Sequence, residues 1–382
     1  MKKYLSTIII SVLTLAVTII IGMEFRSNHR PEIIVRGPGV TEVRWLSDWF
    51  PGLRGSPGDT EVFILRGSEP GESMLIMGGV HPSEPAAFIA AVVLIENMVV
   101  ETGTVFIIPR ANASGFTHNA PQEAHPARYT VDLPDGSFRE FRFGSRLTNP
   151  VHQWPDPDLY IHMSGVPVAG AESRNLNRVF PGRPVGNLTE RVAYAITTLI
   201  VQENILITVD FHEASPEFPT NNAIVVHERA GEMGALLVMD LQDNEGIDNR
   251  FERSPVGLRG LTHRELGDYT TTYMFLFETP NASQGRIRGR TDAALVLTGD
   301  CIMYRRAVAA GFSVFCGCRE VKEPHSMEQR VGRHLAGIYW LFNVLTFDFP
   351  QYGDIVARGI PGFQDIQARG LGTFLLPVRL PL

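Results

Sequence analysis

Cysteine is scarce in this chain, which has only Cys301, Cys316 and Cys318 among 382 residues. A single glycine separates Cys316 from Cys318, which is too short for an easy bridge between them, whereas a bridge from Cys301 to either one is geometrically open. A zinc site made of these three residues is disfavoured because no fourth ligand lies at a familiar spacing. Buried structural cysteine is the default expectation.

Positive charge is not in excess either, because the formal net charge is -7 at neutral pH. Nucleic-acid-binding surfaces are strongly basic, so we expect no nucleic acid among the partners of this chain. Hydrophobic residues make up 44% of the sequence. That content and the length are sufficient for a sizeable core, in one large α/β domain or two smaller ones.

The N-terminus carries an uncharged apolar run over residues 5–23, preceded by Lys2 and Lys3. A run of about twenty residues is long enough to cross a bilayer, and lysines in front of it favour a cytoplasmic N-terminus. No clear small-residue cleavage site follows, so an uncleaved anchor is favoured over a removed signal peptide. In both cases we expect the bulk of the chain to be extracytoplasmic, periplasmic or extracellular, and bound to the membrane in the first case.

The remaining sequence divides by composition. Residues 26–59, with Pro and Gly spread through them, are expected to be a linker. Apolar strand-like runs at 73–77, 103–110, 205–213 and 273–278 alternate with helical stretches at 85–99 and 190–202. This alternation predicts an α/β fold with a mixed, mostly parallel twisted sheet flanked by helices. The polar segment 116–173 has little periodicity and is expected to be a long loop near a site.

His81 and Glu84 follow the apolar run 73–77 and the Gly78-Gly79 pair. In sheets of this kind ligands collect at the carboxyl ends of strands. If the turn is helical, residues three apart share a face, so an imidazole and a carboxylate can bind one cation. A second His-x-x-Glu sequence at 325–328 opens a polar stretch, and we interpret it as a solvated helix start.

Two further strands end in residues with metal or acid-base chemistry. His212 ends the run 205–211 and is a candidate third ligand, with Asp210 as a partner that holds its ring. Glu278 lies where the run 273–277 ends, as a turn residue or as a general base. Glu213 is the competing base, but on an extended strand its side chain should point away from that of His212.

Asn177 and Arg178 lie in a turn-like sequence after the long polar segment. A guanidinium can hold a carboxylate through two parallel hydrogen bonds, and a neighbouring amide can add a third. Taken alone, the pair is better explained as a surface arginine beside a turn.

Together these residues form a recognisable series. Their order and approximate spacing resemble the zinc carboxypeptidase superfamily, in particular the branch that contains succinylglutamate desuccinylase and aspartoacylase. The resemblance depends on the motifs at 78–84, 175–182, 210–212 and 277–279, and it covers about residues 60–345. It implies a hydrolase domain over 60–345, with an anchor or signal segment at 1–25 and a C-terminal tail at 346–382.

The resemblance also implies roles. His81, Glu84 and His212 would bind one Zn²⁺ per chain and leave a position for water, whose pKa the metal lowers to about 7. Glu278 would act as the general base on that water, and Asn177 and Arg178 would hold a substrate carboxylate. The family also supplies an arginine that stabilises the oxyanion; Arg142 and Arg146 are both available, and we prefer Arg146 because residues 143–146 can present it from a turn.

The implied reaction is hydrolysis of an amide bond beside a substrate carboxylate. An N-acyl amino acid and a short peptide both satisfy this description, as in a deacylase or a metallocarboxypeptidase. The family's substrate-proximal tyrosine has no clear counterpart here, because Tyr269 and Tyr273 are only nearby. The alternative function is a membrane-anchored protein that binds a carboxylate or peptide without catalysis.

Overall fold

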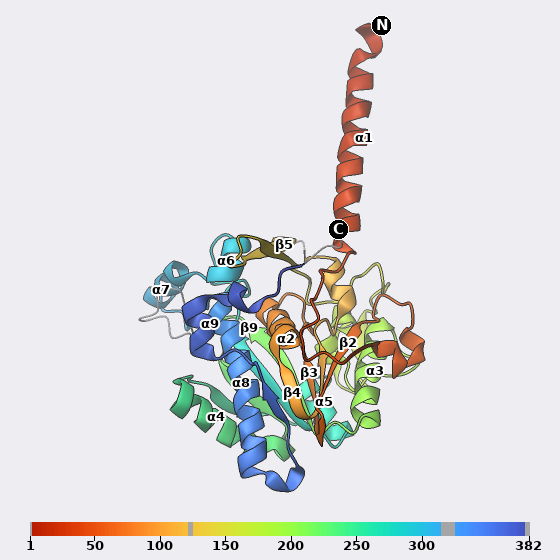
Figure 1. Cartoon of the computed structure of the whole chain (residues 1–382). Coiled ribbons are helices and arrows are strands. Elements are labelled where there is room, and N and C mark those ends of the chain that lie inside the picture. The colour runs from red at the N-terminus through yellow and green to blue at the C-terminus, as the bar shows by residue number, and fades with distance from the viewer. Residues whose placement is uncertain (1, 121–124, 315–324, 379–382) are drawn as a thin grey trace.

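The N-terminal helix stands apart from the rest of the molecule (Figure 1). The computed structural model describes residues 2–120, 125–314 and 325–378, and in it α1 (Lys2–Asn28) projects as a single rod. The apolar window of α1 is not buried against the rest of the protein. A helix of 27 residues rises about 40 Å. That exceeds the roughly 30 Å hydrocarbon core of a bilayer, so α1 is long and apolar enough to span a membrane.

A twisted mixed sheet forms the centre of the remaining chain. Its strands follow the order β1-β2-β4-β3-β9-β12-β10-β11, with β13 paired to the start of β4. The four central strands β4, β3, β9 and β12 are parallel, and antiparallel pairs connect them to β2 on one side and β10 on the other. The predicted mixed α/β sheet is therefore present, with the parallel part in the middle. The strand bounds are Glu42–Trp45 (β1), Glu61–Arg66 (β2), Glu69–Met77 (β3), Val99–Ile108 (β4), Ile207–Ala214 (β9), Ala223–Val226 (β10), Arg250–Arg253 (β11), Tyr273–Pro280 (β12) and Val356–Arg358 (β13).

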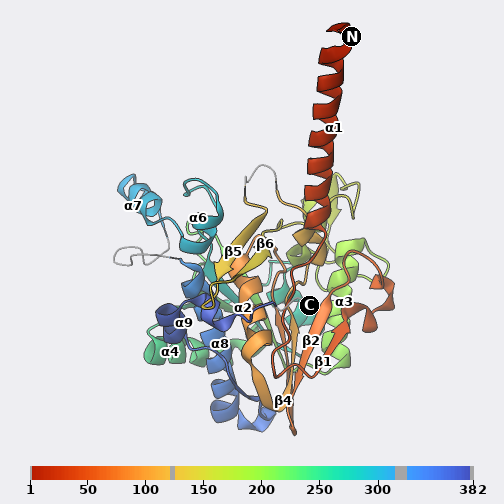
Figure 2. The same cartoon turned by 45° about the horizontal axis from the view of Figure 1, so that its top comes forward.

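Helices cover both faces of the sheet. One face packs against α2 (Pro85–Asn97), α4 (Gly231–Glu245) and α8 (Met327–Asp348), whose apolar side chains form one continuous core with β3, β9 and β12. The other face packs against α3 (Leu188–Gln202) and α5 (Thr262–Tyr269). Because β9 lies between the two layers, all eight of its residues are buried. Three shorter helices, α6 (Ala293–Thr298), α7 (Cys301–Ala309) and α9 (Phe363–Arg369), lie on the side of α8 (Figures 1 and 2).

The segment 116–173, expected to be a loop, contains two small hairpins. They pair β5 (Arg128–Asp132) with β6 (Phe138–Arg142), and β7 (Leu159–Ile161) with β8 (Pro167–Ala169). The chain then passes through the 3-10 turns η5 (Gly170–Arg174) and η6 (Leu176–Arg178). Strands of three to five residues are too short to produce a periodicity that the sequence alone reveals.

The segments expected as linker and tail both add strands to the sheet. Within 26–59, β1 pairs with β2, and Leu46, Trp49 and Leu53 are buried. Within 346–382, β13 pairs with β4, and Ile366 and Leu371 are buried. Spread Pro and Gly residues therefore mark turns at the sheet edge here. Of the cysteines, Cys301 begins α7, while Cys316 and Cys318 lie outside the described residues, so the possible pairings stay predictions.

Candidate metal centre and substrate cavity

A tight turn after β3 carries His81 and Glu84. Gly79 has φ +62°, a conformation that favours glycine, and a Cβ on Gly78 would lie 2.6 Å from the carbonyl oxygen of Ala87 in α2. The Glu84 N–H donates to the carbonyl of His81 at 2.9 Å. Pro85 then begins α2, where its fixed φ suits the first helical position. The glycine pair and the proline thus bring an imidazole and a carboxylate three residues apart onto one side of the turn.

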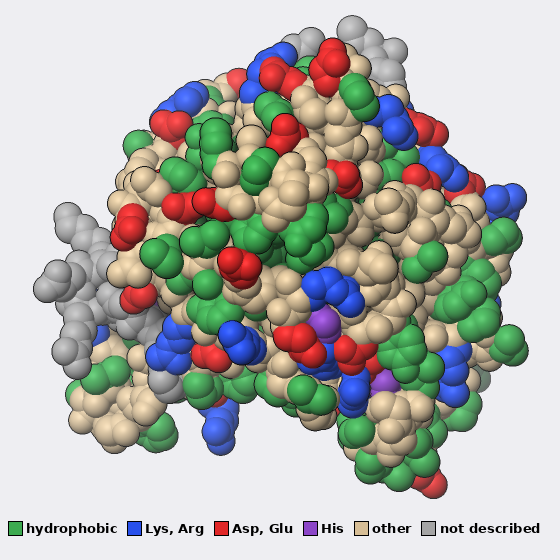
Figure 3. Space-filling model, turned by 90° about the horizontal axis from the view of Figure 1, so that it is seen from below, with side chains coloured by type: hydrophobic (Ala, Val, Ile, Leu, Met, Phe, Trp, Pro, Cys, Tyr) green, Lys and Arg blue, Asp and Glu red, His purple; other side chains and the backbone are tan. Residues whose placement is uncertain are grey.

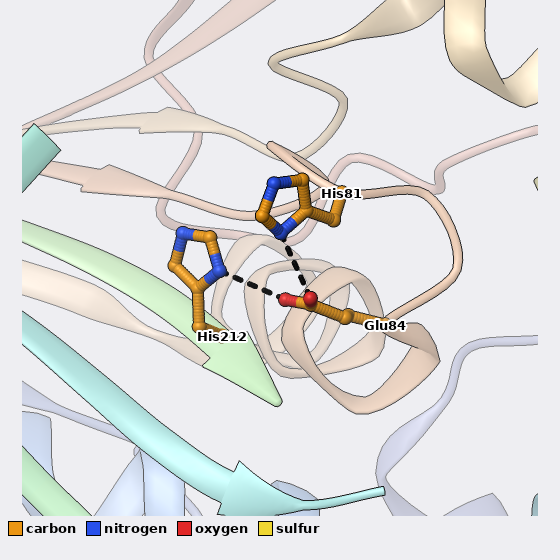
Figure 4. Close-up of side chains that lie close together, drawn as sticks. All are labelled: His81, Glu84 and His212. Carbon is orange, nitrogen blue, oxygen red and sulfur yellow. Dashed lines mark hydrogen bonds and ion pairs between the residues drawn. The ribbon is translucent and has the colours of Figure 1, made fainter. Parts of the chain in front are cut away.

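His81, Glu84 and His212 converge at the carboxyl ends of β3 and β9 (Figure 4). The Nδ1 atom of His81 lies 2.8 Å from Oε1 of Glu84, and Nδ1 of His212 lies 2.9 Å from Oε2 of the same carboxylate. All three residues are buried. Two imidazole nitrogens and one carboxylate are a typical zinc donor set, and one candidate atom from each lies within 4.8 Å of the others.

The other nitrogen of each ring is held by a buried polar group. Nε2 of His212 lies 2.7 Å from Oδ2 of Asp210, which also accepts from the Thr262 hydroxyl at 2.6 Å. Nε2 of His81 lies 2.9 Å from Oδ1 of Asn175. Such contacts fix the orientation and tautomer of a ligating histidine. With Nε2 engaged in both rings, Nδ1 is the atom that each presents to the shared carboxylate, so the residues present fit a divalent metal.

The protonation of the three candidate ligands depends on burial and on mutual charge. Burial, and after it the charge of the nearby Arg146, lower the pKa of His81 to about 3. Burial opposes the charged form of His212 as well, but Asp210 and then Glu84 outweigh it and hold its pKa well above the usual value. Burial also opposes ionisation of Glu84, yet the two histidines keep its pKa well below the usual range. A metal that binds here would therefore displace a proton from His212.

A cavity of about 280 Å³ opens on these residues. Glu278, from the end of β12, lines it together with the three candidate ligands, and the strand register places Glu278 beside His212. Burial raises the pKa of Glu278 to about 8, against the opposing charge of His212. A carboxylate with a raised pKa beside a candidate metal site is suited to proton transfer. Glu213 points to the opposite face, where it accepts from Arg330 at 2.7 Å, as its position next to His212 predicts.

Three polar side chains from the segment 145–178 also line the cavity. Arg146 donates to Oε1 of Glu84 at 3.1 Å and remains 41% exposed. Arg178 lies beside it, and burial lowers the pKa of Arg178. Oδ1 of Asn177 accepts from the Thr262 N–H at 2.8 Å, which leaves its NH₂ group as the donor. Arg142, the other candidate for the oxyanion, lies elsewhere, because its guanidinium binds Glu32 at 2.7 Å and the carbonyl of Asn28 at 2.8 Å.

Arg146 also lines a second cavity of about 300 Å³. This cavity is bounded by Ser83, His125 and Glu172 and by residues 284–285. Arg146 therefore borders both cavities.

Sequence reasoning identified the three candidate ligands and Asp210 but missed other residues of the site. Asn175 was not singled out, although it lies in the same motif as Asn177 and both amides are buried. Thr262 holds both Asp210 and Asn177 and is far from either in the chain. The apolar cavity wall, which includes Leu276 and Leu258, was also missed. Tyr269 and Tyr273 do not line the cavity.

A second group of possible ligands lies in the short turn just before α4 and on α5. One candidate atom each from His227, Glu228 and Asp268 lies within the same 4.8 Å limit. Arg264 is buried among them and binds Glu228 at 2.8 Å as well as Asp268. Arg259 binds Asp268 at 2.6 Å. Guanidinium groups here occupy the carboxylate oxygens that a metal would need.

No family model matches this sequence, and none of the curated proteins does. Solved structures that are similar include a succinylglutamate desuccinylase/aspartoacylase from Rhodobacter sphaeroides, with 17% identity, TM-score 0.37 and coverage of 60% of this chain and 54% of that one. The cell shape determinant protein Csd4 from Helicobacter pylori has 12% identity and TM-score 0.45, with coverage of 82% and 59%. The ectoine utilization protein EutE from Ruegeria pomeroyi has 16% identity and TM-score 0.36, with coverage of 66% and 61%.

The branch that the sequence motifs resemble is thus among these structures. This chain spans between 54% and 61% of the length of the three. At identities and TM-scores this low, the likenesses assign no activity to this chain.

Proposed function

We propose that this chain is a zinc-dependent hydrolase that cleaves an amide bond next to a substrate carboxylate. The observation that carries the proposal is the convergence on one cavity of a buried His-Glu-His donor set, a glutamate with a raised pKa, and two arginines. Each feature alone has an ordinary structural explanation. A cavity that contains all of them meets the requirements of metal-assisted hydrolysis.

His81, Glu84 and His212 would hold the metal, with Asp210 and Asn175 fixing the two rings. When bound, zinc supplies an activated water at neutral pH and polarises the substrate carbonyl. The chain's own groups do the rest. The Glu278 carboxylate takes the proton from the attacking water and returns it to the leaving amine. Arg146 would stabilise the negative charge that develops on the carbonyl oxygen.

Arg178 and the NH₂ group of Asn177 would bind the substrate carboxylate. Arg178 is suited to this because a guanidinium offers a planar fork of donors to a carboxylate. The cavity of about 280 Å³ lies just below the roughly 300–1,000 Å³ typical of ligand pockets, which favours a small acyl or aminoacyl group. The second cavity beside Arg146 supports a substrate that continues past the scissile bond. An N-acyl amino acid and the end of a short peptide both fit.

We further propose that α1 is an uncleaved membrane anchor and that the hydrolase domain is extracytoplasmic. Its length, its apolar composition and the two lysines in front of it support this orientation.

Elemental analysis of the purified full chain tests the proposal. We expect about one zinc per chain, lost in both His81→Ala and His212→Ala, with Glu278→Gln as a variant that retains zinc but loses most of its activity. Wild type and Glu278→Gln are then compared on N-acyl amino acids and short peptides. Absence of bound zinc, with no uptake on addition, would exclude the hydrolase and leave a carboxylate- or peptide-binding protein as the better explanation.

A further inference from the structure

The β7–β8 hairpin presents an apolar face to its surroundings. Leu159 and Ile161 point outward from β7 and are 54% and 57% exposed. They pair with Ala169 and Pro167, which are also exposed. No charged residue occurs over 159–169. An exposed hairpin normally places polar side chains on its solvent face, so this face requires an explanation.

The opposite side of the hairpin is firmly attached to the domain. The hydroxyl of Tyr160 donates to Glu190 at the start of α3 at 2.8 Å, and Nε2 of His162 lies 2.6 Å from the carbonyl of Phe180. Both residues are buried. Because Tyr160 and His162 fix the inner face, strand alternation fixes Leu159 and Ile161 outward. The exposed apolar face is therefore held in place by the fold.

Two further exposed apolar side chains precede the hairpin. Trp154 is 76% exposed and Val151 is 83% exposed. The nearby Asp156 is neutralised by two bonds from Arg174, at 2.7 and 2.8 Å. Asp158, which is exposed, marks the polar edge of this surface. We call the surface formed by Val151, Trp154, Leu159, Ile161 and the turn residues Met163 and Val166 the apolar hairpin surface.

The apolar hairpin surface belongs to a segment that contacts the end of α1. The ring of His152 lies 5.7 Å from that of His29, the first residue after α1. The last turn of α1 is also fixed to the domain, because Arg128 donates to the carbonyl of Ser27 at 3.0 Å and Arg142 to that of Asn28 at 2.8 Å. In Figures 1 and 2 the yellow to yellow-green segments that follow β6 lie around the foot of α1. The foot of α1 is therefore held against the domain, and one of its contacts is with His152 in the segment that precedes the hairpin.

The face of the molecule away from α1 is different. It intersperses acidic, basic and apolar side chains, as expected of a surface in water (Figure 3). The segment 151–161, whose His152 contacts the foot of α1, carries by contrast an exposed tryptophan and exposed aliphatic side chains. Tryptophan is enriched where proteins meet the headgroup region of a bilayer, and aliphatic side chains favour the acyl boundary below it.

From this placement we propose that the apolar hairpin surface docks on the outer leaflet of the same bilayer that α1 crosses, so that the domain has a second membrane contact and a fixed orientation. The proposal rests on α1 crossing the bilayer and is independent of the proposed hydrolase chemistry. A bilayer is favoured over a protein partner because the segment that precedes the hairpin contacts the foot of α1 at His152 and because the hairpin, residues 159–169, has no charged residue, whereas charged groups give a protein interface its specificity.

The experiment measures fluorescence of the full chain in phosphatidylcholine vesicles. Lipids brominated near the headgroup or near the end of the acyl chain quench tryptophan according to its depth. We expect lipids brominated near the headgroup to quench the fluorescence more strongly than lipids brominated near the chain end. Most of this quenching should be lost in Trp154→Phe and kept in Trp340→Phe. A Leu159→Ser/Ile161→Ser variant should also lose most of the Trp154 signal. The matched control, Met239→Ser/Phe347→Ser, removes two exposed apolar side chains on α4 and α8 and should change nothing.

Folding of each variant is checked by its zinc content and circular dichroism. If Trp154 is quenched by aqueous iodide and not by bromolipid, the surface faces water and the proposal is wrong. If neither agent quenches it, a protein surface covers it, and the proposal is equally wrong. Release of the wild-type chain from vesicles by alkaline carbonate would show that α1 does not span the bilayer and would overturn the docking as well. None of these outcomes changes the zinc content or the hydrolytic activity expected of the chain, so the two proposals can fail separately.

Discussion

Two groups of residues in this molecule contain the same metal-binding chemistry but in different surroundings. At the ends of β3 and β9, one carboxylate is shared by two histidines, and all three residues are buried. At α4 and α5, His227 lies 3.0 Å from Asp268, but Arg264 and Arg259 bind the carboxylates of the group. Glu228 is 59% exposed there.

The difference shows that donor atoms in proximity are not sufficient for a metal site. A guanidinium that already neutralises a carboxylate competes with a cation and adds repulsion against it. Among the residues that the structure describes, Arg146 is the arginine that forms an ion pair with Glu84, and its side chain is 41% exposed. The first group is therefore the one that we propose as the metal site, whereas the second group forms a network of ion pairs. Four predictions test this assignment, from the largest expected effect to the smallest.

Removal of a ligand from the first group should abolish metal binding. His212→Ala is expected to lose bound zinc and, with it, all measurable hydrolysis, because a three-ligand site cannot retain the ion with two. His227→Ala removes the equivalent residue of the second group and should retain full zinc content. Elemental analysis measures the zinc content of both variants. Loss of zinc in His227→Ala but not in His212→Ala would mean that the second group binds the metal.

Glu278→Gln should lower kcat by about 10²–10⁴-fold while zinc content stays unchanged. Burial raises the pKa of Glu278 to about 8. The ionised form accepts the proton, so activity should fall as the pH decreases through this pKa. A bound cation favours the carboxylate, which places the acid limb of the zinc enzyme below pH 8. A pH-rate profile of the wild type measures the pH at which activity falls on the acid side. The same fall at the same pH in Glu278→Gln would mean that another group is the base.

Asp210→Asn should weaken zinc binding by about 10–100-fold without abolishing it, because the ring of His212 loses its charged partner. The matched substitution in the second group is Asp268→Asn, which also removes one carboxylate beside a histidine. Competition for zinc with a chelator gives both dissociation constants. Equal effects in the two variants would mean that Asp210 acts only through stability.

Asp268→Asn should instead affect stability, with a defined dependence on pH. Burial raises the pKa of Asp268, but Arg264, His227 and Arg259 outweigh it and lower the pKa to about 2. The stabilisation is thus present above the unfolded pKa of about 4 and is lost as the pH falls towards 2. We expect a loss of about 1–2 kcal/mol at pH 7, discounted for partial exposure. Denaturant unfolding of the full chain in detergent at pH 7 and pH 3 should show the difference shrinking at the lower pH.

Much of the fold was predictable from the sequence because its central strands are strongly apolar. The runs at 73–77 and 205–211 are buried on both faces and therefore appear as continuous hydrophobic sequence. The edge strands β1 and β13 were not predicted. Their burial pattern is mixed, and short edge strands with Pro and Gly nearby resemble linkers in composition.

The candidate ligands were predictable for the same reason, since each follows a recognisable strand. Thr262 and Asn175 were not, because their roles depend on contacts between segments far apart in the chain. His325 shows a related failure. The helix begins after it as predicted, with Ser326 as the N-cap, but His325 is buried and not solvated. The residues that begin a helix can be recognised from the local sequence, whereas the burial of a residue depends on the other segments that pack against it.

Because His212 and Glu213 lie on opposite faces of β9, the alignment of this strand in the sheet decides which of the two side chains reaches the cavity. A shift of β9 by one residue would put Glu213 in the cavity and His212 under α8, opposite the fully buried Arg330. The donor set of such a chain would consist of two carboxylates, from Glu84 and Glu213, and one imidazole, from His81, and the guanidinium of Arg330 would lose its carboxylate in the core. Zinc binding would therefore favour the correctly aligned chain. Only that chain offers the metal two imidazoles, so only that chain gains the stabilisation that ligand binding supplies.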